Sequence, residues 1–142
     1  MFFDFIIAFI RTNRLKGRRE CFAWESECLE NYIVWAFSKK YLFVSLTDSK
    51  INGVGVAYPL PNKNTGNVVS LLPSDADLDL PEASSDLCVM DWIALDAQGR
   101  KDLMSQFNTR FPNWENQDKY GIQFGKPKLL TNKYMNLLKG IN

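Results

Sequence analysis

The sequence predicts one mixed α/β (α+β) domain in which helices cover a single layer of sheet. Two apolar segments with helical spacing open the chain, and a pair of short apolar runs separated by turn residues follows them. Strand-like and helical segments then alternate to the C-terminus. A length of 142 residues suits a single domain, 1–142, that buries a core of its own.

Residues 1–12 and 20–38 are the two predicted N-terminal helices. In the first, the apolar residues that recur at helical spacing are Phe2, Phe5, Ile6 and Phe9. This pattern predicts a helix that packs on the core, and a helix lying in a membrane interface is the alternative. No signal peptide is expected, because the basic residues follow the apolar run. About 20 residues are needed to cross a bilayer, so a transmembrane segment is not expected either.

The remaining elements follow in chain order. Residues 41–46 and 54–58 predict a hairpin around a turn at 47–53, and Pro59 ends it. The later elements are a short strand at 68–72, a buried strand at 87–95, a helix at 99–110, a strand at 120–124 and a closing helix at 132–138.

The formal net charge is +1, and the chain contains no histidine. The lack of histidine excludes Ser-His-Asp and Cys-His catalysis, a histidine general base and His-ligated zinc. Cys21, Cys28 and Cys88 lack the spacing of a metal or redox motif, so we expect no metal and three reduced thiols in a cytoplasmic protein. Charge is nevertheless uneven, since residues 74–96 are acidic and residues 97–142 are basic.

Asp91 is the most informative single residue, because it lies within an otherwise apolar strand. A buried carboxylate is costly unless it has partners or a function. The strand leads into the helix at 99–110, and anionic ligands commonly bind where a strand ends and a helix begins. An Asp91 that points outward or pairs with a nearby basic residue is the structural alternative.

The stretch Val89-Met90-Asp91-Trp92-Ile93-Ala94-Leu95, a turn with Gly99, and a helix ending in Arg110-Phe111-Pro112 together resemble one known family. This family is the toxin-activating lysine acyltransferases, which attach fatty acyl chains to RTX toxins. They carry an F-I-D-W-I-A-P-F-G stretch and a helix that ends in a basic-Phe-Pro sequence. The resemblance extends over about residues 18–130, and its specific part is residues 91–94.

The resemblance implies a GNAT-like fold, with a mostly antiparallel central sheet flanked by helices. It also implies that an acyl group passes from acyl carrier protein to a lysine of a protein substrate, with Asp91 as a catalytic residue. We expect Trp92, Gly99 and Arg100 to bind substrate. No bound cofactor is expected, because acyl-acyl carrier protein is itself the donor.

The family's second catalytic residue is a histidine, whose place falls near Glu20 and Cys21 in this chain. Glu20 or Cys21 could replace it, since Arg18 and Arg19 favour the thiolate of Cys21. Alternatively, transfer proceeds without a side-chain base if the lysine arrives deprotonated. A third alternative is a non-catalytic protein-binding or inhibitor module on the same scaffold, encoded by a mobile element.

The partner classes follow from these alternatives. Acyl carrier protein is acidic, so its docking surface is expected to be basic and to draw on residues 11–19 and on Lys119, Lys126, Lys128, Lys133 and Lys139. Nucleic acid is not expected, because no helix-turn-helix, zinc or RNA-binding signature is present. The oligomeric state is left open between monomer and homodimer.

Overall fold

The computed structural model describes residues 2–14, 26–59, 86–123 and 126–138. Its elements, in chain order, are α1 (Phe2–Arg14), α2 (Ser26–Ser38), β1 (Leu42–Thr47), β2 (Lys50–Pro59), β3 (Leu87–Ala94), α3 (Ala97–Arg110), the 3₁₀ turn η4 (Trp114–Asn116), β4 (Lys119–Gln123), β5 (Lys126–Leu130) and α4 (Asn132–Leu138). The strand predicted at 68–72 and the start of the helix predicted at 20–38 lie outside the described residues.

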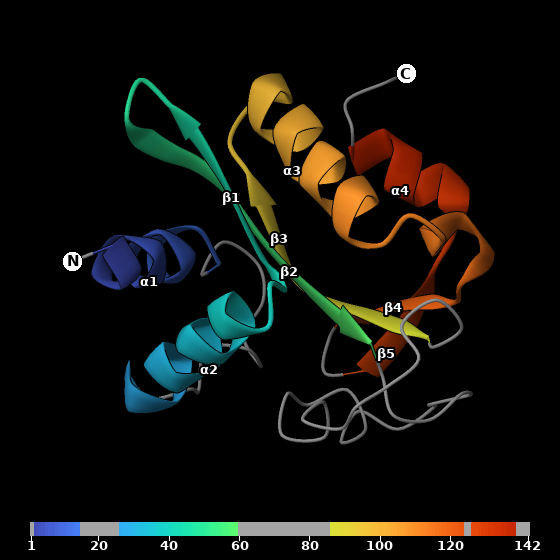
Figure 1. Cartoon of the computed structure of the whole chain (residues 1–142), viewed down its shortest axis with the longest axis horizontal. Coiled ribbons are helices and arrows are strands. Elements are labelled where there is room, and N and C mark those ends of the chain that lie inside the picture. The colour runs from blue at the N-terminus through green and yellow to red at the C-terminus, as the bar shows by residue number, and fades with distance from the viewer. Residues whose placement is uncertain (1, 15–25, 60–85, 124–125, 139–142) are drawn as a thin grey trace.

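The five strands form one sheet in the order β1-β2-β3-β4-β5. Neighbouring strands are antiparallel except β3 and β4, which are parallel. Helices α1 and α2 lie on one face of the sheet, called here the first face (Figure 1). Helix α3 covers the opposite, second face, with α4 beside it (Figure 1). The predicted mixed α/β architecture, a mostly antiparallel sheet flanked by helices, is therefore confirmed.

Two β-bulges decide which side chains reach each face. In β2, Gly53 pairs with Ser45 but Ile51 pairs with Leu46, so Asn52 is an extra residue. In β3, Val89 pairs with Ala57 but Asp91 pairs with Val56, so Met90 is extra. An extra residue reverses the alternation of side chains that follows it. Each bulge thus exchanges the faces on which later residues of its strand lie.

The core on the second face is built around the Phe107 ring of α3, which is fully buried. Four aromatic rings have their centroids within 5.5–6.1 Å of it, those of Phe43, Trp92, Phe111 and Trp114. Gly55 makes room for this cluster, because a Cβ there would come within 3.0 Å of the Trp92 ring. Helix α3 contacts β1, β2 and β3, and this aromatic cluster joins it to β1 and β3.

The hairpin turn is shorter than predicted. It consists of Asp48 and Ser49, which both have positive φ, 52° and 66°, so Thr47 pairs directly with Lys50. Two central residues with positive φ match the right-handed twist of the strands. Gly53, predicted to belong to the turn, lies within β2, where the side chain of Leu103 packs against it. The strand β5 was not predicted from the sequence.

Lys119 lies at the start of β4 and is only 2% exposed, so the expectation that it belongs to a basic docking surface is wrong. Its Nζ donates to the carbonyl oxygens of Trp114 and Gln117, at 2.8 and 2.6 Å. Burial lowers the pKa of Lys119 below the usual 10.5, an effect that the carboxylates of Asp118 and Glu115 oppose. The ammonium therefore acts as an internal hydrogen-bond donor to the η4 turn.

Replacing Lys119 by methionine is expected to destabilise the protein by about 1–3 kcal/mol at neutral pH, because two carbonyls lose a donor. The difference should widen as the pH approaches 10.5. Between the lowered pKa of the folded lysine and 10.5, the unfolded chain binds more protons than the folded one. Raising the pH through this range therefore favours the folded state. Urea unfolding of both proteins across this range measures the difference.

The titration of Tyr120 changes the free energy of unfolding with pH in the opposite direction. Burial raises its pKa above 10.0, and the carboxylates of Asp86 and Asp118 raise it further. The folded tyrosine therefore keeps its proton where the unfolded one loses it, and stability falls as the pH passes 10.0. Comparing wild type with Lys119→Met at each pH removes this shared contribution. If the difference in unfolding free energy between wild type and Lys119→Met stayed constant with pH, the lowered pKa of Lys119 would be contradicted.

Candidate active site around Asp91

The bulge at Met90 sets the direction of the Asp91 side chain. Cys88 pairs with Tyr58, whose ring contacts Trp35 of α2 at 5.2 Å, so Cys88 faces α2. Regular alternation from Cys88 would direct Asp91 toward α3. Because Met90 is an extra residue, Asp91 instead pairs with Val56 and faces α2. The alternative in which Asp91 points outward is wrong, since the residue is only 3% exposed.

Tyr32 of α2 meets this carboxylate. Its hydroxyl donates a hydrogen bond of 2.7 Å to Oδ2 of Asp91, and Tyr32 is itself 4% exposed. A hydrogen bond from a hydroxyl to a carboxylate offsets part of the cost of burying the charge. The two residues are 59 positions apart in the sequence. Tyr32 lies within the helix predicted at 20–38, but no sequence pattern pairs it with Asp91.

Among the described residues, the parallel ladder between β3 and β4 is short. The two parallel strands pair only at Leu87–Lys119 and Cys88–Tyr120. From Val89 onward β3 has no ladder partner in β4, although β3 continues to Ala94. Backbone N–H and C=O groups without a ladder partner can pair with an extended ligand. The buried carboxylate therefore follows directly after the point where the parallel ladder ends.

Trp92 lies on the face opposite to Asp91. It pairs with Gly55, and its ring meets Phe107 edge-on at a centroid distance of 5.7 Å. Its indole Nε1 is buried and has no acceptor among the described residues. The structure thus gives Trp92 a packing role against α3 and does not bring it together with Asp91. Substrate binding by Trp92 stays a prediction.

Gly99 and Arg100 lie in the first turn of α3, beyond the end of β3. Asp96 caps this helix, and its Oδ1 accepts hydrogen bonds from Gly99 N at 2.7 Å and from Asn52 Nδ2 at 3.1 Å. A carboxylate thus already occupies the helix N-terminus where an anionic ligand was expected. Substrate binding by Gly99 and Arg100 stays a prediction, with Gly99 in close contact with β2.

Gly99 is required by the approach of α3 to β2. A Cβ at Gly99 would lie 2.8 Å from the backbone oxygen of Asn52. We expect Gly99→Ala to destabilise the protein by about 1–3 kcal/mol, because helix or strand must shift. At Gly121 the nearest atoms to an added Cβ are at 3.6 Å, an ordinary contact, so Gly121→Ala is the matched control. Equal midpoints for the two variants in urea unfolding would contradict the assigned contact.

The other two predicted catalytic residues, Glu20 and Cys21, lie outside the described residues, so their relation to Asp91 stays a prediction. Among residues 2–14, 26–59, 86–123 and 126–138, no group of three or more acidic or cysteine side chains is placed to hold a metal ion. In the same part of the chain, no helix has the length and apolar character needed to span a bilayer.

The chain was compared with protein-family models, with curated proteins and with solved structures, and none of the three comparisons finds a match.

Proposed function

We propose that this protein transfers a fatty acyl group from acyl carrier protein to a lysine of a target protein. The observation that carries the proposal is the buried Asp91, hydrogen-bonded by Tyr32, on a bulged strand three residues beyond its last described ladder pair with β4. β-Bulges commonly redirect a side chain next to an active site. The sequence around Asp91 supports the same assignment through its resemblance to the toxin-activating acyltransferases.

The proposed chemistry needs a proton acceptor but no histidine. The lysine nitrogen attacks the thioester carbonyl, the C–S bond breaks and an amide C–N bond forms. The nitrogen loses one proton to the Tyr32 oxygen while the Tyr32 proton passes to Oδ2 of Asp91, 2.7 Å away. The same proton then returns from Asp91 through Tyr32 to the leaving thiolate of the carrier, which restores both residues. Glu20 or Cys21 is the candidate to complete the site in place of the family's histidine.

The proposed place for the donor is the stretch of β3 that has no ladder partner in β4 among the described residues. The prosthetic arm of an acyl carrier protein is a linear chain with amide groups, which can pair with strand-edge N–H and C=O groups. The stretch of β3 from Asp91 to Ala94 has no ladder partner in β4 among the described residues. An arm bound there would bring the thioester beside the strand that carries the catalytic carboxylate.

A non-catalytic binding module is the second candidate, and one observation favours it. Asp91 and Tyr32 are only 3% and 4% exposed, so their hydrogen bond could serve to join α2 to the sheet alone. A protein that keeps the scaffold without the chemistry would still bind a partner. The two candidates differ in whether the thioester is ever cleaved.

The test follows the donor thioester. The full-length chain is mixed with dodecanoyl-acyl carrier protein and a lysine-containing fragment of an RTX toxin, and release of the carrier's free thiol is measured. We expect release that depends on both the chain and the fragment. If the carrier stays fully acylated while the chain forms a stable complex with it or with the fragment, the binding module replaces the enzyme.

A further inference from the structure

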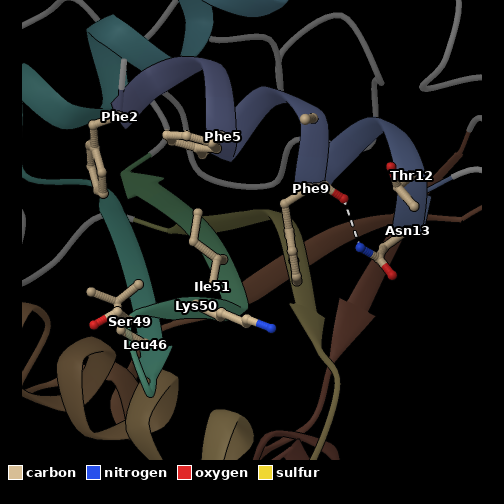
Figure 2. A pocket seen from close by; sticks show the side chains of 10 residues that line it. Phe2, Phe5, Phe9, Thr12, Asn13, Leu46, Ser49, Lys50 and Ile51 are labelled. Carbon is tan, nitrogen blue, oxygen red and sulfur yellow. Dashed lines mark hydrogen bonds between the residues drawn. The ribbon is translucent and has the colours of Figure 1, made fainter.

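An apolar groove of about 530 Å³ runs between α1 and the tip of the β1–β2 hairpin. Helix α1 contributes the rings of Phe2, Phe5 and Phe9, and the hairpin contributes Leu46 and Ile51 (Figure 2). The first and last of these rings are seven positions apart, about 10 Å along the helix axis. Phe2, Phe5 and Leu46 are 46%, 66% and 55% exposed, so these apolar groups are only partly covered.

The second bulge builds one wall of this groove. Ser45 and Gly53 face α3, since a Cβ at Gly53 would lie 3.2 Å from the Leu103 side chain. Because Asn52 is an extra residue, Ile51 moves to the first face and pairs with Leu46 opposite α1. The backbone register of the hairpin thus places Leu46 and Ile51 side by side to form the apolar wall.

Polar groups of the groove come from the end of α1 and from the hairpin turn. They are Thr12, Asn13, Ser49 and Lys50. Lys50 is the only charged residue among the described residues that line the groove, and the side chain extends from the hairpin below Phe9 in the view of Figure 2. Asn13 is held near Phe9 by a hydrogen bond of 2.9 Å from its Nδ2 to the Phe9 carbonyl oxygen.

We propose that this groove binds one single-chain amphiphile with an anionic head group, of the fatty-acid class. Small-molecule sites are typically concave, mostly apolar and about 300–1,000 Å³, with a few polar groups that orient the ligand. A stripe of three rings along a helix matches a linear chain in shape. The lone ammonium of Lys50 matches a carboxylate in charge, with the chain running along Phe9 and Phe5 toward Phe2.

The proposed site is separate from the acyl-transfer site. Ile51 and Asp91 lie on the same face of the sheet, but Asp91 pairs with Val56, five residues from Ile51 along β2. That separation corresponds to roughly 15 Å along an extended strand. A ligand with its head group at Lys50 is therefore not the thioester that Asp91 would process, and its binding does not require that transfer occurs.

The experiment is isothermal titration calorimetry, in which the chain is titrated with sodium dodecanoate below its critical micelle concentration. We expect saturable binding of one chain per protein. Leu46→Ser should weaken it about tenfold, because an apolar side chain of the wall is lost. Leu129→Ser is the matched control, since Leu129 is 53% exposed against 55% for Leu46 and lies on β5. Its affinity should equal that of wild type.

Lys50→Met tests the head group. This variant should weaken dodecanoate several-fold but leave uncharged dodecanol unchanged. The proposal is overturned if dodecanoate shows no saturable binding, or if Leu46→Ser and Leu129→Ser bind it equally. It is also overturned if only anionic phospholipid vesicles bind, or if the chain dimerises through this surface and Leu46→Ser makes it monomeric. Dodecanoate binding without any thioester cleavage would leave this site intact and refute the proposed function alone.

Discussion

Asp91→Asn is expected to lower the rate of acyl transfer by about 10²–10⁴-fold, the usual contribution of a positioned acid or base. Asparagine keeps the shape of the side chain and can still accept the hydrogen bond from Tyr32, but its amide cannot take up the proton. The fold should therefore survive, because the contact at 2.7 Å is retained. Initial rates of thiol release from dodecanoyl-acyl carrier protein measure the loss.

The control for this variant is another buried aspartate near the same strand. Asp86 precedes β3 and is 4% exposed, against 3% for Asp91. Asp86→Asn should cost stability but leave the rate close to that of wild type. Tyr32→Phe should lower the rate, and the double variant with Asp91→Asn should be no slower than Asp91→Asn, because the two residues act on one proton. A full additional loss in the double variant would contradict the relay.

Phe107→Ala is expected to have the largest effect on stability, a loss of about 3–5 kcal/mol. The Phe107 side chain is fully buried and lies within 6.1 Å of four other aromatic centroids, so its removal leaves a cavity under α3. Urea unfolding followed by tryptophan fluorescence measures the loss, since Trp92 and Trp114 are both in contact with this ring.

The matched control is an apolar residue that the structure leaves in solvent. Leu95 follows β3 and is 57% exposed, so Leu95→Ala should change the unfolding free energy by less than about 0.5 kcal/mol. If Phe107→Ala cost no more than Leu95→Ala, the aromatic cluster would not be the centre of this core.

The sequence predicts the elements of the fold whose periodicity is strong. The apolar run at 87–95 and the amphipathic segment at 99–110 correspond to β3 and α3. The hairpin was predicted with too long a turn, because Gly53 suggests a bend whereas its small size serves the packing of Leu103. β5 carries Pro127 and two lysines in five residues, a pattern too weak for a strand prediction, and its place at the sheet edge tolerates the proline.

The candidate site was predictable only in part. Asp91 was identifiable because a carboxylate within an apolar strand is unusual. Its orientation was not, since one extra residue at Met90 exchanges the faces of Asp91 and Trp92 and leaves no signature in the sequence. Tyr32 is a distant partner, and helical spacing indicates that it is buried without indicating what it touches.

The most direct test of the proposed function is the intact mass of the acceptor. A lysine-containing fragment of an RTX toxin is incubated with dodecanoyl-acyl carrier protein and either the wild-type chain or Asp91→Asn. We expect the fragment to gain the mass of one dodecanoyl group on a lysine with wild type, and none on the same timescale with Asp91→Asn. An unmodified fragment with both proteins, or equal acylation by both, would contradict it.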